Sequence, residues 1–270
     1  MKNFEFTIYD QNIWGNMPGT ESISNRNGII KDLILSYNAD VCCFQECNPY
    51  TSRVGDTDIS LLLENNYIEA KTPVGNKNFT PVFYRKDRFE AVESGYHIFE
   101  GRNDVASKSL TYCVLKEKAS GGMVGVISTH FWWENKDEED NYWRIENAKT
   151  VLSYMYNLQK KYNIPVFAAG DLNCGSNSPQ LKEPWEYMKT KALDIRDIAE
   201  KTSYDNTCDP YPKKDENGIY HFVTTKKNYM IDHIFLTKDS NVKVHEFKVD
   251  NSERACDSSD HSPLIVKATV

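Results

Sequence analysis

The chain has no apolar run long enough to cross a bilayer, and its first residues, Met1 to Glu5, lack the apolar core of a secretory signal. It also has no internal repeat, no low-complexity tract and no long linker rich in proline, glycine or serine. These absences argue against a membrane-spanning or repeat protein and favour a cytoplasmic location. With 270 residues, the sequence predicts a single domain over residues 1–270.

Two common catalytic motifs are missing. There is no Gly-x-Ser-x-Gly nucleophile elbow, which argues against acyl hydrolysis by a Ser/His/Asp triad. There is no Gly-x-x-x-x-Gly-Lys loop, which argues against a P-loop nucleotide hydrolase. The formal net charge is −7, and no arginine-rich stretch is present. This charge disfavours a long nucleic-acid duplex as the substrate, because proteins that bind long duplexes neutralise many backbone phosphates and are usually more basic.

The seven cysteines do not form a recognisable framework. Cys42 and Cys43 are adjacent, which is poor geometry for a bond between them. Cys43 and Cys47 are separated by three residues, and no second cysteine pair follows to complete a zinc site. The sequence therefore predicts buried, reduced thiols.

Apolar runs of strand type alternate with stretches of helical periodicity. The helical stretches are residues 29–37, 61–63 and 143–160. The strand candidates are residues 4–9, 41–44, 82–84, 110–115, 123–128, 166–169, 231–236 and 264–266. The acidic run from Asp137 to Asp140 is predicted as a solvated loop before the third helix. This mixture predicts sheets covered by helices.

Polar side chains suited to a metal and a phosphate stand at the ends of these strands. Residues at strand ends are held rigidly yet face a crevice where ligands bind. Asp232 lies inside an apolar run, and a buried carboxylate is costly unless it has a partner. One shared site explains the pattern better than coincidence. The groups are Asn12, Gln45-Glu46, Thr129-His130, Gly170-Asp171-Leu172-Asn173, Ile231-Asp232-His233 and Ser259-Asp260-His261.

This ordered series resembles the endonuclease/exonuclease/phosphatase superfamily, which includes deoxyribonuclease I, exonuclease III, neutral sphingomyelinase and inositol polyphosphate 5-phosphatases. The match runs from residue 12 to residue 263. The resemblance implies an α/β (α+β) fold of deoxyribonuclease I type. That fold is a four-layer sandwich of two packed, mostly antiparallel β-sheets flanked by helices, with the site at one end.

The resemblance also implies a set of roles for a divalent cation and a phosphate ester. The expected cation is Mg²⁺, with Mn²⁺ as an alternative, because Mg²⁺ prefers oxygen ligands and keeps several waters. Proton transfer is expected from a histidine whose ring is fixed by a carboxylate. The implied metal ligands are Glu46, Asp260 and Asn12, and the implied catalytic residues are His130, Asp171, Asn173, Asp232 and His261. Among these, His261 pairs with Asp232, Asp171 and Asn173 face the phosphate and the attacking water, and His130 donates to a phosphate oxygen.

Three further residues are expected at the substrate. Asn78 matches a position where deoxyribonuclease-like members of the superfamily commonly have an acidic residue that supports the first histidine. Its amide would therefore orient His130. Lys108 matches a phosphate-binding arginine and brings the charge without the bidentate fork. Trp132, in Phe131-Trp132-Trp133, either stacks on the substrate or packs in the core. The lysines at 213, 214, 226 and 227 are predicted as surface residues rather than phosphate ligands.

The predicted function is a divalent-metal-dependent phosphodiesterase, broadly nuclease-like. One alternative is a phosphomonoesterase, or a lipid or sugar phosphodiesterase, of the inositol-phosphatase and sphingomyelinase type. A second is a non-catalytic binding module on the same fold, although every proposed catalytic position is chemically competent. The expected partner is a phosphate ester from a nucleic acid, nucleotide, phospholipid or sugar phosphate, and no obligate protein partner is evident.

Overall fold

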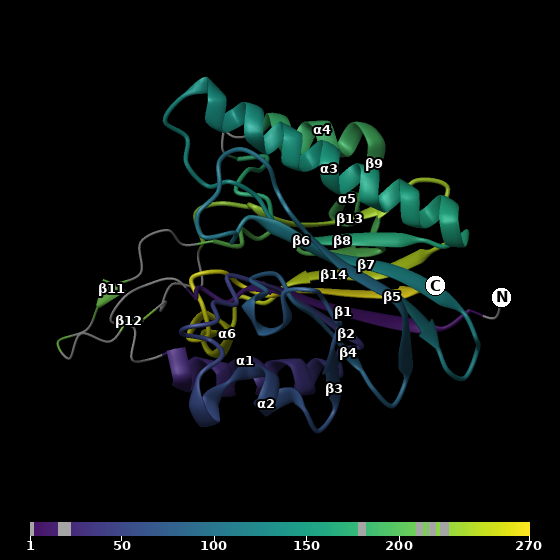
Figure 1. The fold of residues 1–270 in the computed structure, drawn as a ribbon, viewed down its shortest axis with the longest axis horizontal. Helices are drawn as coiled ribbons and strands as arrows, with labels where there is room; N and C mark the ends of the chain where they lie inside the picture. The colour runs from purple at the N-terminus through teal and green to yellow at the C-terminus, as the bar shows by residue number, and fades with distance from the viewer. Residues whose placement is uncertain are drawn as a thin grey trace.

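Two β-sheets pack face to face, and helices cover the outer surface of each (Figure 1). The computed structural model describes residues 3–15, 23–177, 182–208, 213–214, 216, 220–221 and 227–270. The helices α3 (Glu138–Tyr162) and α4 (Glu183–Lys191) lie on one side, and α1 (Ile23–Tyr37) and α2 (Ile59–Leu63) on the other. The four-layer sandwich is therefore confirmed.

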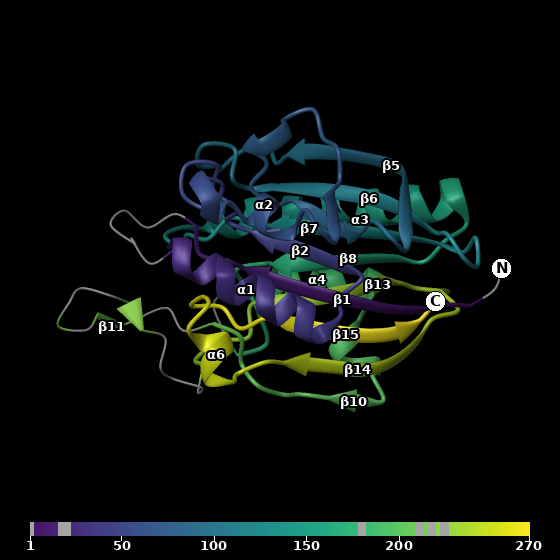
Figure 2. The same cartoon turned by 90° about the horizontal axis from the view of Figure 1, so that it is seen from below.

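The seven-stranded sheet has the order β10-β14-β15-β1-β2-β4-β3. Within it, β1 is parallel to β2 and β10 is parallel to β14, and the other neighbours are antiparallel. Figure 2 shows α1 lying over β1 on the outer face of this sheet. The strands are β1 (Glu5–Asn12), β2 (Val41–Gln45), β3 (Tyr67–Glu69), β4 (Val82–Arg85), β10 (Lys201–Thr202), β14 (Lys243–Val249) and β15 (Leu264–Thr269).

The six-stranded sheet has the order β5-β6-β7-β8-β13-β9, with β7 and β8 as its parallel pair. Mixed but mostly antiparallel pairing is thus a property of both sheets, as predicted. The strands are β5 (Phe89–Ile98), β6 (Ser109–Glu117), β7 (Met123–His130), β8 (Val166–Asp171), β9 (Ala192–Asp194) and β13 (Asp232–Thr237). A separate pair is formed by β11 (Lys213–Lys214) and β12 (Tyr220–His221).

The main core lies between the two sheets. Phe6 of β1 packs edge-on to Phe89 of β5, with ring centroids 5.7 Å apart, and also contacts Phe167 of β8 at 6.0 Å. Outside the six-stranded sheet, α3 buries an apolar stripe of helical spacing that includes Ala148 and Met155. Burial of these aromatic and aliphatic side chains is the dominant stabilising term, and it fixes the strand ends that carry the polar groups.

The remaining helical segments are short. They are α5 (Ile195–Ile198), α6 (Glu253–Cys256), and the 3₁₀ turns Gly55–Thr57 and Gly75–Lys77. None of the described helices combines the length and apolar character that crossing a bilayer requires. All seven cysteines are free thiols in buried positions, which confirms the predicted burial.

The acidic run before α3 was predicted as a loop, and that prediction is wrong. Asp137 is the N-cap of α3, and its side chain accepts a hydrogen bond from the Asp140 backbone N–H. Asp140 is buried and accepts from Trp132 Nε1 at 2.7 Å. Carboxylates are favourable in the first turn of a helix because the exposed backbone N–H groups there carry positive partial charge.

The prediction of surface lysines fails at Lys227. Its side chain is buried, and its Nζ donates to the Asp260 carbonyl oxygen at 3.4 Å. Lys213 and Lys214 form β11. Lys226 lies outside the described residues.

Candidate active site

The strand ends that carry the polar groups meet at one edge of the sandwich. In the seven-stranded sheet, Asn12 of β1 lies opposite Gln45 of β2. In the six-stranded sheet, Asp171 of β8 pairs with His130 on one side and Asp232 on the other. The two sheets are joined at this edge, because Asn12 Nδ2 donates to Asp171 Oδ2 at 2.9 Å. The ends of the parallel pairs β1–β2 and β7–β8, with Glu46 directly after β2, therefore bring Asn12, Glu46, His130 and Asp171 together.

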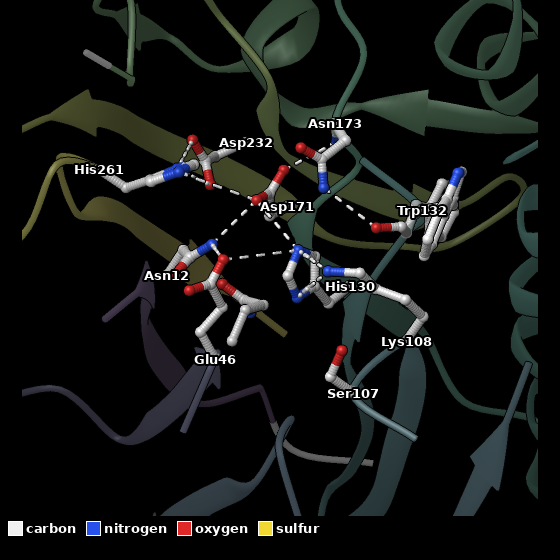
Figure 3. A network of polar contacts seen from close by, with 12 residues as sticks. Asn12, Glu46, Ser107, Lys108, His130, Trp132, Asp171, Asn173, Asp232 and His261 are labelled. Atoms are coloured by element: carbon white, nitrogen blue, oxygen red, sulfur yellow. Dashed lines mark hydrogen bonds and ion pairs between the residues drawn. The ribbon is translucent and has the colours of Figure 1, made fainter. Parts of the chain in front are cut away.

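Asp171 occupies the centre of the cluster (Figure 3). Besides Asn12, its Oδ2 has His130 Nε2 at 3.4 Å and His261 Nε2 at 3.9 Å. Burial raises the pKa of Asp171 well above the usual carboxyl range, and the nearby His261 opposes this shift. A carboxyl group in this environment can exchange a proton near neutral pH.

Asn173 lies beside Asp171 on the loop after β8. Its backbone N–H donates to Asp171 Oδ1 at 2.8 Å, and its Nδ2 donates to the Phe131 carbonyl oxygen at 3.0 Å. Asn173 has a φ of 50°, a left-handed conformation that asparagine tolerates better than most residues. The turn thus holds the asparagine and aspartate side chains against the end of β7.

His261 is paired with Asp232. The ring Nδ1 lies 2.8 Å from Asp232 Oδ2 and 3.0 Å from Oδ1. Burial, the largest single effect, would lower the pKa of His261, but the charges around the ring, that of Asp232 first, together with its hydrogen bond to Asp232 raise the pKa well above the usual histidine value. The Asp232 backbone N–H donates to Thr207 Oγ1 at 3.3 Å. The pair therefore has the carboxylate–imidazole arrangement expected from the sequence.

His130 also has a basic neighbour, Lys108, close to the same ring nitrogen that faces Asp171. Lys108 Nζ lies 3.0 Å from His130 Nε2, and both side chains are buried. Burial, followed by the Lys108 charge, lowers the pKa of His130 well below the usual histidine value. Burial also lowers the pKa of Lys108. The imidazole is therefore neutral at physiological pH and offers a hydrogen-bonding ring rather than a charge.

Two overlapping groups of side chains could hold a metal ion. Glu46, His130 and Asp171 each offer one ligand atom, and these atoms lie within 4.8 Å of one another. Asp171, Asp232 and His261 form the second group. Carboxylate oxygens and imidazole nitrogens are suitable ligands for divalent cations. The donor set therefore fits a cation at this edge.

Asp260 lies next to these groups but outside both of them. Burial raises its pKa to about 6, and the charge of Glu46 adds to the shift. Glu46 is thus close enough to Asp260 for the two carboxylates to repel each other. A cation between them would relieve this repulsion.

Three sequence predictions need correction. Asn12 was expected to present its amide oxygen to a metal, but Oδ1 accepts from the Trp14 backbone N–H at 2.9 Å while Nδ2 faces Glu46 and Asp171. Its side chain is therefore a donor between two carboxylates. Asn78 was expected to orient His130, but its amide bonds to Thr80 and Thr111, which hold it away from this role.

Trp132 is the third correction. Its side chain is only 7% exposed, and its Nε1–H donates a hydrogen bond to Asp140 Oδ1, so the indole packs against the start of α3. Its neighbour Trp133 is 52% exposed. The aromatic side chain open to a ligand in this segment is therefore Trp133.

Two supporting residues were missed by sequence reasoning. Gln11 Nε2 donates to Ser258 Oγ at 2.8 Å and to the His261 carbonyl oxygen at 2.9 Å, and so fixes the segment that carries His261. Arg26 of α1 is buried and bonds main-chain carbonyls on both sides of the site edge. Arg26 lies on a helix, where no strand-end pattern points to the site.

Two packed sheets with histidines and carboxylates gathered at one edge are the arrangement expected of a phosphoesterase of the resembled family. The chain belongs to the Endonuclease/Exonuclease/phosphatase family, whose sequence model matches residues 11–261. No curated protein matches the chain.

Solved structures with the same fold cover nearly the whole chain. An endonuclease/exonuclease/phosphatase family protein from Bacteroides thetaiotaomicron is 21% identical, with a TM-score of 0.74 over 100% of this chain and 99% of that one. A mannosyl-6-phosphatase from the same organism is 21% identical, with a TM-score of 0.70 over 97% and 99%. D. rerio TDP2 in complex with a single-strand DNA product is 16% identical, with a TM-score of 0.70 over 98% and 99%.

Proposed function

We propose that this chain is a Mg²⁺-dependent phosphodiesterase that hydrolyses a phosphate ester at the cluster around Asp171. The observation that carries the proposal is the position of Asp171 Oδ2, which has Asn12, His130 and His261 around it in one buried site. Phosphoryl transfer requires neutralised charge, a positioned water and a stabilised leaving oxygen, and this cluster has side chains for each task.

Glu46 is the proposed first ligand of the cation and Asp260 the second, because Glu46 offers a ligand atom beside His130 and Asp171 and its charge adds to the raised pKa of the buried Asp260 carboxyl. When bound, Mg²⁺ would neutralise charge on the phosphate and leaving oxygens. Asn12 donates to Glu46 Oε1 at 3.1 Å and holds that carboxylate in place.

The other residues act on the water and the phosphate. Asp232 holds Nδ1 of His261, so that Nε2 of the same ring is free to move a proton near Asp171. Asp171 and Asn173 orient the attacking water. Lys108 provides a positive charge beside His130, and the two together bind a non-bridging phosphate oxygen.

A second candidate function is hydrolysis of a phosphomonoester, or of a sugar or lipid phosphodiester. The net charge of −7 favours a small substrate over a long polyanion. The structural likeness to a mannosyl-6-phosphatase supports this candidate, and the likeness to a protein bound to a single-strand DNA product supports a nucleic-acid substrate. Both candidates use the same cluster.

The test is hydrolysis of bis(p-nitrophenyl) phosphate and p-nitrophenyl phosphate, with and without Mg²⁺, beside plasmid nicking. We expect Mg²⁺-dependent turnover of the diester that is lost in Glu46→Ala and His261→Ala. Faster turnover of the monoester would favour the second candidate. Full diester turnover by both variants would show that the site is wrongly assigned, and no turnover of any phosphate ester would contradict the enzyme proposal.

A further inference from the structure

Two segments distant in sequence lie side by side at the site edge. The first is the β1 loop, residues 13–15, which follows Asn12. The second is the β15 approach, residues 258–261, which carries Asp260 and His261. Ser259 Oγ of the approach donates to the Asn12 carbonyl oxygen at 2.7 Å. The relative placement of Asn12 and Asp260 therefore depends on how these two segments are joined.

Arg26 joins them through its guanidinium group. Nη1 donates to the Ile13 carbonyl oxygen at 3.0 Å and to the Ser258 carbonyl oxygen at 2.8 Å. Nη2 donates to the Trp14 carbonyl oxygen at 3.1 Å. A planar guanidinium can bond several acceptors in fixed directions, whereas a lysine ammonium cannot reproduce this geometry.

The positive charge of Arg26 is also buried, and it interacts with two carboxylates of the site. The side chain is 3% exposed, and the guanidinium donates to three neutral carbonyl groups, those of Ile13, Trp14 and Ser258. Burial lowers the pKa of Arg26 to about 10, and the charges of Asp260 and Glu46 oppose this shift. The charges of Asp260 and Glu46 therefore stabilise the cationic form of this buried side chain.

We propose that Arg26 is a positioning residue for the metal site. By fixing the β1 loop against the β15 approach, it holds Asp260 in place relative to Asn12, whose amide bonds Glu46, and so sets the affinity of the site for a divalent cation. Arg26 does not contact the cation. The inference rests on the proposed metal-dependent function, and it assigns the role of a supporting partner to a residue on a helix outside the strand-end cluster.

The test is titration calorimetry of the purified protein with Mn²⁺, comparing wild type, Arg26→Lys and Arg88→Lys. Arg88 is a matched control at the opposite end of β1, where it bonds Asp40 Oδ1 at 2.5 Å and the Glu5 carbonyl oxygen at 3.1 Å. We expect Arg26→Lys to raise the Kd for Mn²⁺ about 10- to 100-fold, the range seen when a supporting partner of a metal ligand is removed. Arg88→Lys should keep the wild-type Kd.

Calorimetry separates this role from a purely structural one. A purely structural role would reduce the fraction of protein that binds Mn²⁺ and leave the Kd unchanged, and that result overturns the proposal. If Arg26→Lys does not fold, Arg26→Gln decides, because its shorter amide can bond one of the two segments but cannot bridge both as the guanidinium does. Wild-type affinity in Arg26→Gln would then overturn the proposal, and a several-fold weaker Kd would support it. Failure of the wild type to bind Mn²⁺ would instead contradict the proposed function.

Discussion

His261 is bracketed by two carboxylates: its Nδ1 lies 2.8 Å from Asp232 Oδ2, and its Nε2 lies 3.9 Å from Asp171 Oδ2. Asp232 is close enough for a hydrogen bond, and Asp171 is not. The two sides of the ring therefore have different tasks. Asp232 fixes the orientation of the ring, and Nε2 faces the region where Asp171 and an incoming phosphate would meet.

Replacing Asp232 by asparagine tests this division. The Asp232→Asn side chain keeps the size of aspartate but loses the charge that favours the protonated ring. We expect kcat for phosphodiester hydrolysis to fall by about 100-fold or more, because positioned acid–base catalysis contributes about 10²- to 10⁴-fold. Steady-state kinetics at saturating Mg²⁺ measure this change.

A histidine–carboxylate pair on the surface provides a control for this substitution. His245 Nδ1 lies 3.1 Å from Glu200 Oε2, so Glu200→Gln also removes the carboxylate partner of a histidine. This variant should keep wild-type kcat. Equal activity of Asp232→Asn and Glu200→Gln would contradict the role given to Asp232.

Glu46→Gln should weaken divalent-cation binding. The amide is a poorer ligand than the carboxylate, and it removes one of the charges that the cation would neutralise. We expect the Kd for Mn²⁺ to rise at least about tenfold, with the folded structure unchanged by circular dichroism. The matched control is Glu64→Gln, which changes an exposed carboxylate at the end of α2 and should keep the wild-type Kd. Wild-type affinity in Glu46→Gln would remove Glu46 from the ligand set.

The two adjacent tryptophans should behave differently when each is replaced by alanine. Trp132→Ala removes a buried indole and should lower the free energy of unfolding by about 3–5 kcal/mol. Trp133→Ala removes an exposed ring, so stability should hardly change. If Trp133 stacks on the substrate, its loss should raise KM, since stacking contributes about 1–3 kcal/mol per base. Unchanged KM for every substrate tested would remove Trp133 from the binding surface.

Glu93 should make part of the stability depend on pH. Hydrogen bonds from Lys161 and Tyr162 lower its pKa in the folded protein. A lowered carboxyl pKa stabilises the fold above the unfolded pKa, and this stabilisation is lost as the pH falls. Glu93→Gln should therefore be less stable than wild type at pH 7, by up to about 1 kcal/mol, and much of the difference should be lost at about pH 3, well below the unfolded pKa. Urea unfolding at both pH values measures it, and a difference that is constant with pH would contradict the prediction.

The strand-end residues of the site could be predicted from the sequence because each follows or interrupts a short apolar run. Asp171 follows Val166 to Ala169, and Asp232 begins the apolar strand β13. These local patterns fix which side chains leave the end of a strand. The order of the groups along the chain then identified the fold.

Residues that act across the fold could not be predicted in this way. Arg26 reaches the site from a helix, and Lys227 is buried through a contact with a carbonyl group 33 residues later. Asn78 was misplaced because its amide bonds Thr80, two residues later, and Thr111 of the distant strand β6. Such contacts depend on tertiary structure, for which a single sequence has no local signal.

The place of β15 between β14 and β1 has a consequence for synthesis of the protein. His261 and Asp260 immediately precede β15, and Asn12 ends β1, so the earliest and latest parts of the site are neighbours in space. A nascent chain that has not yet released residues 264–269 from the ribosome lacks a central strand of one sheet. It therefore cannot assemble the cluster around Asp171 until this segment has left the ribosome.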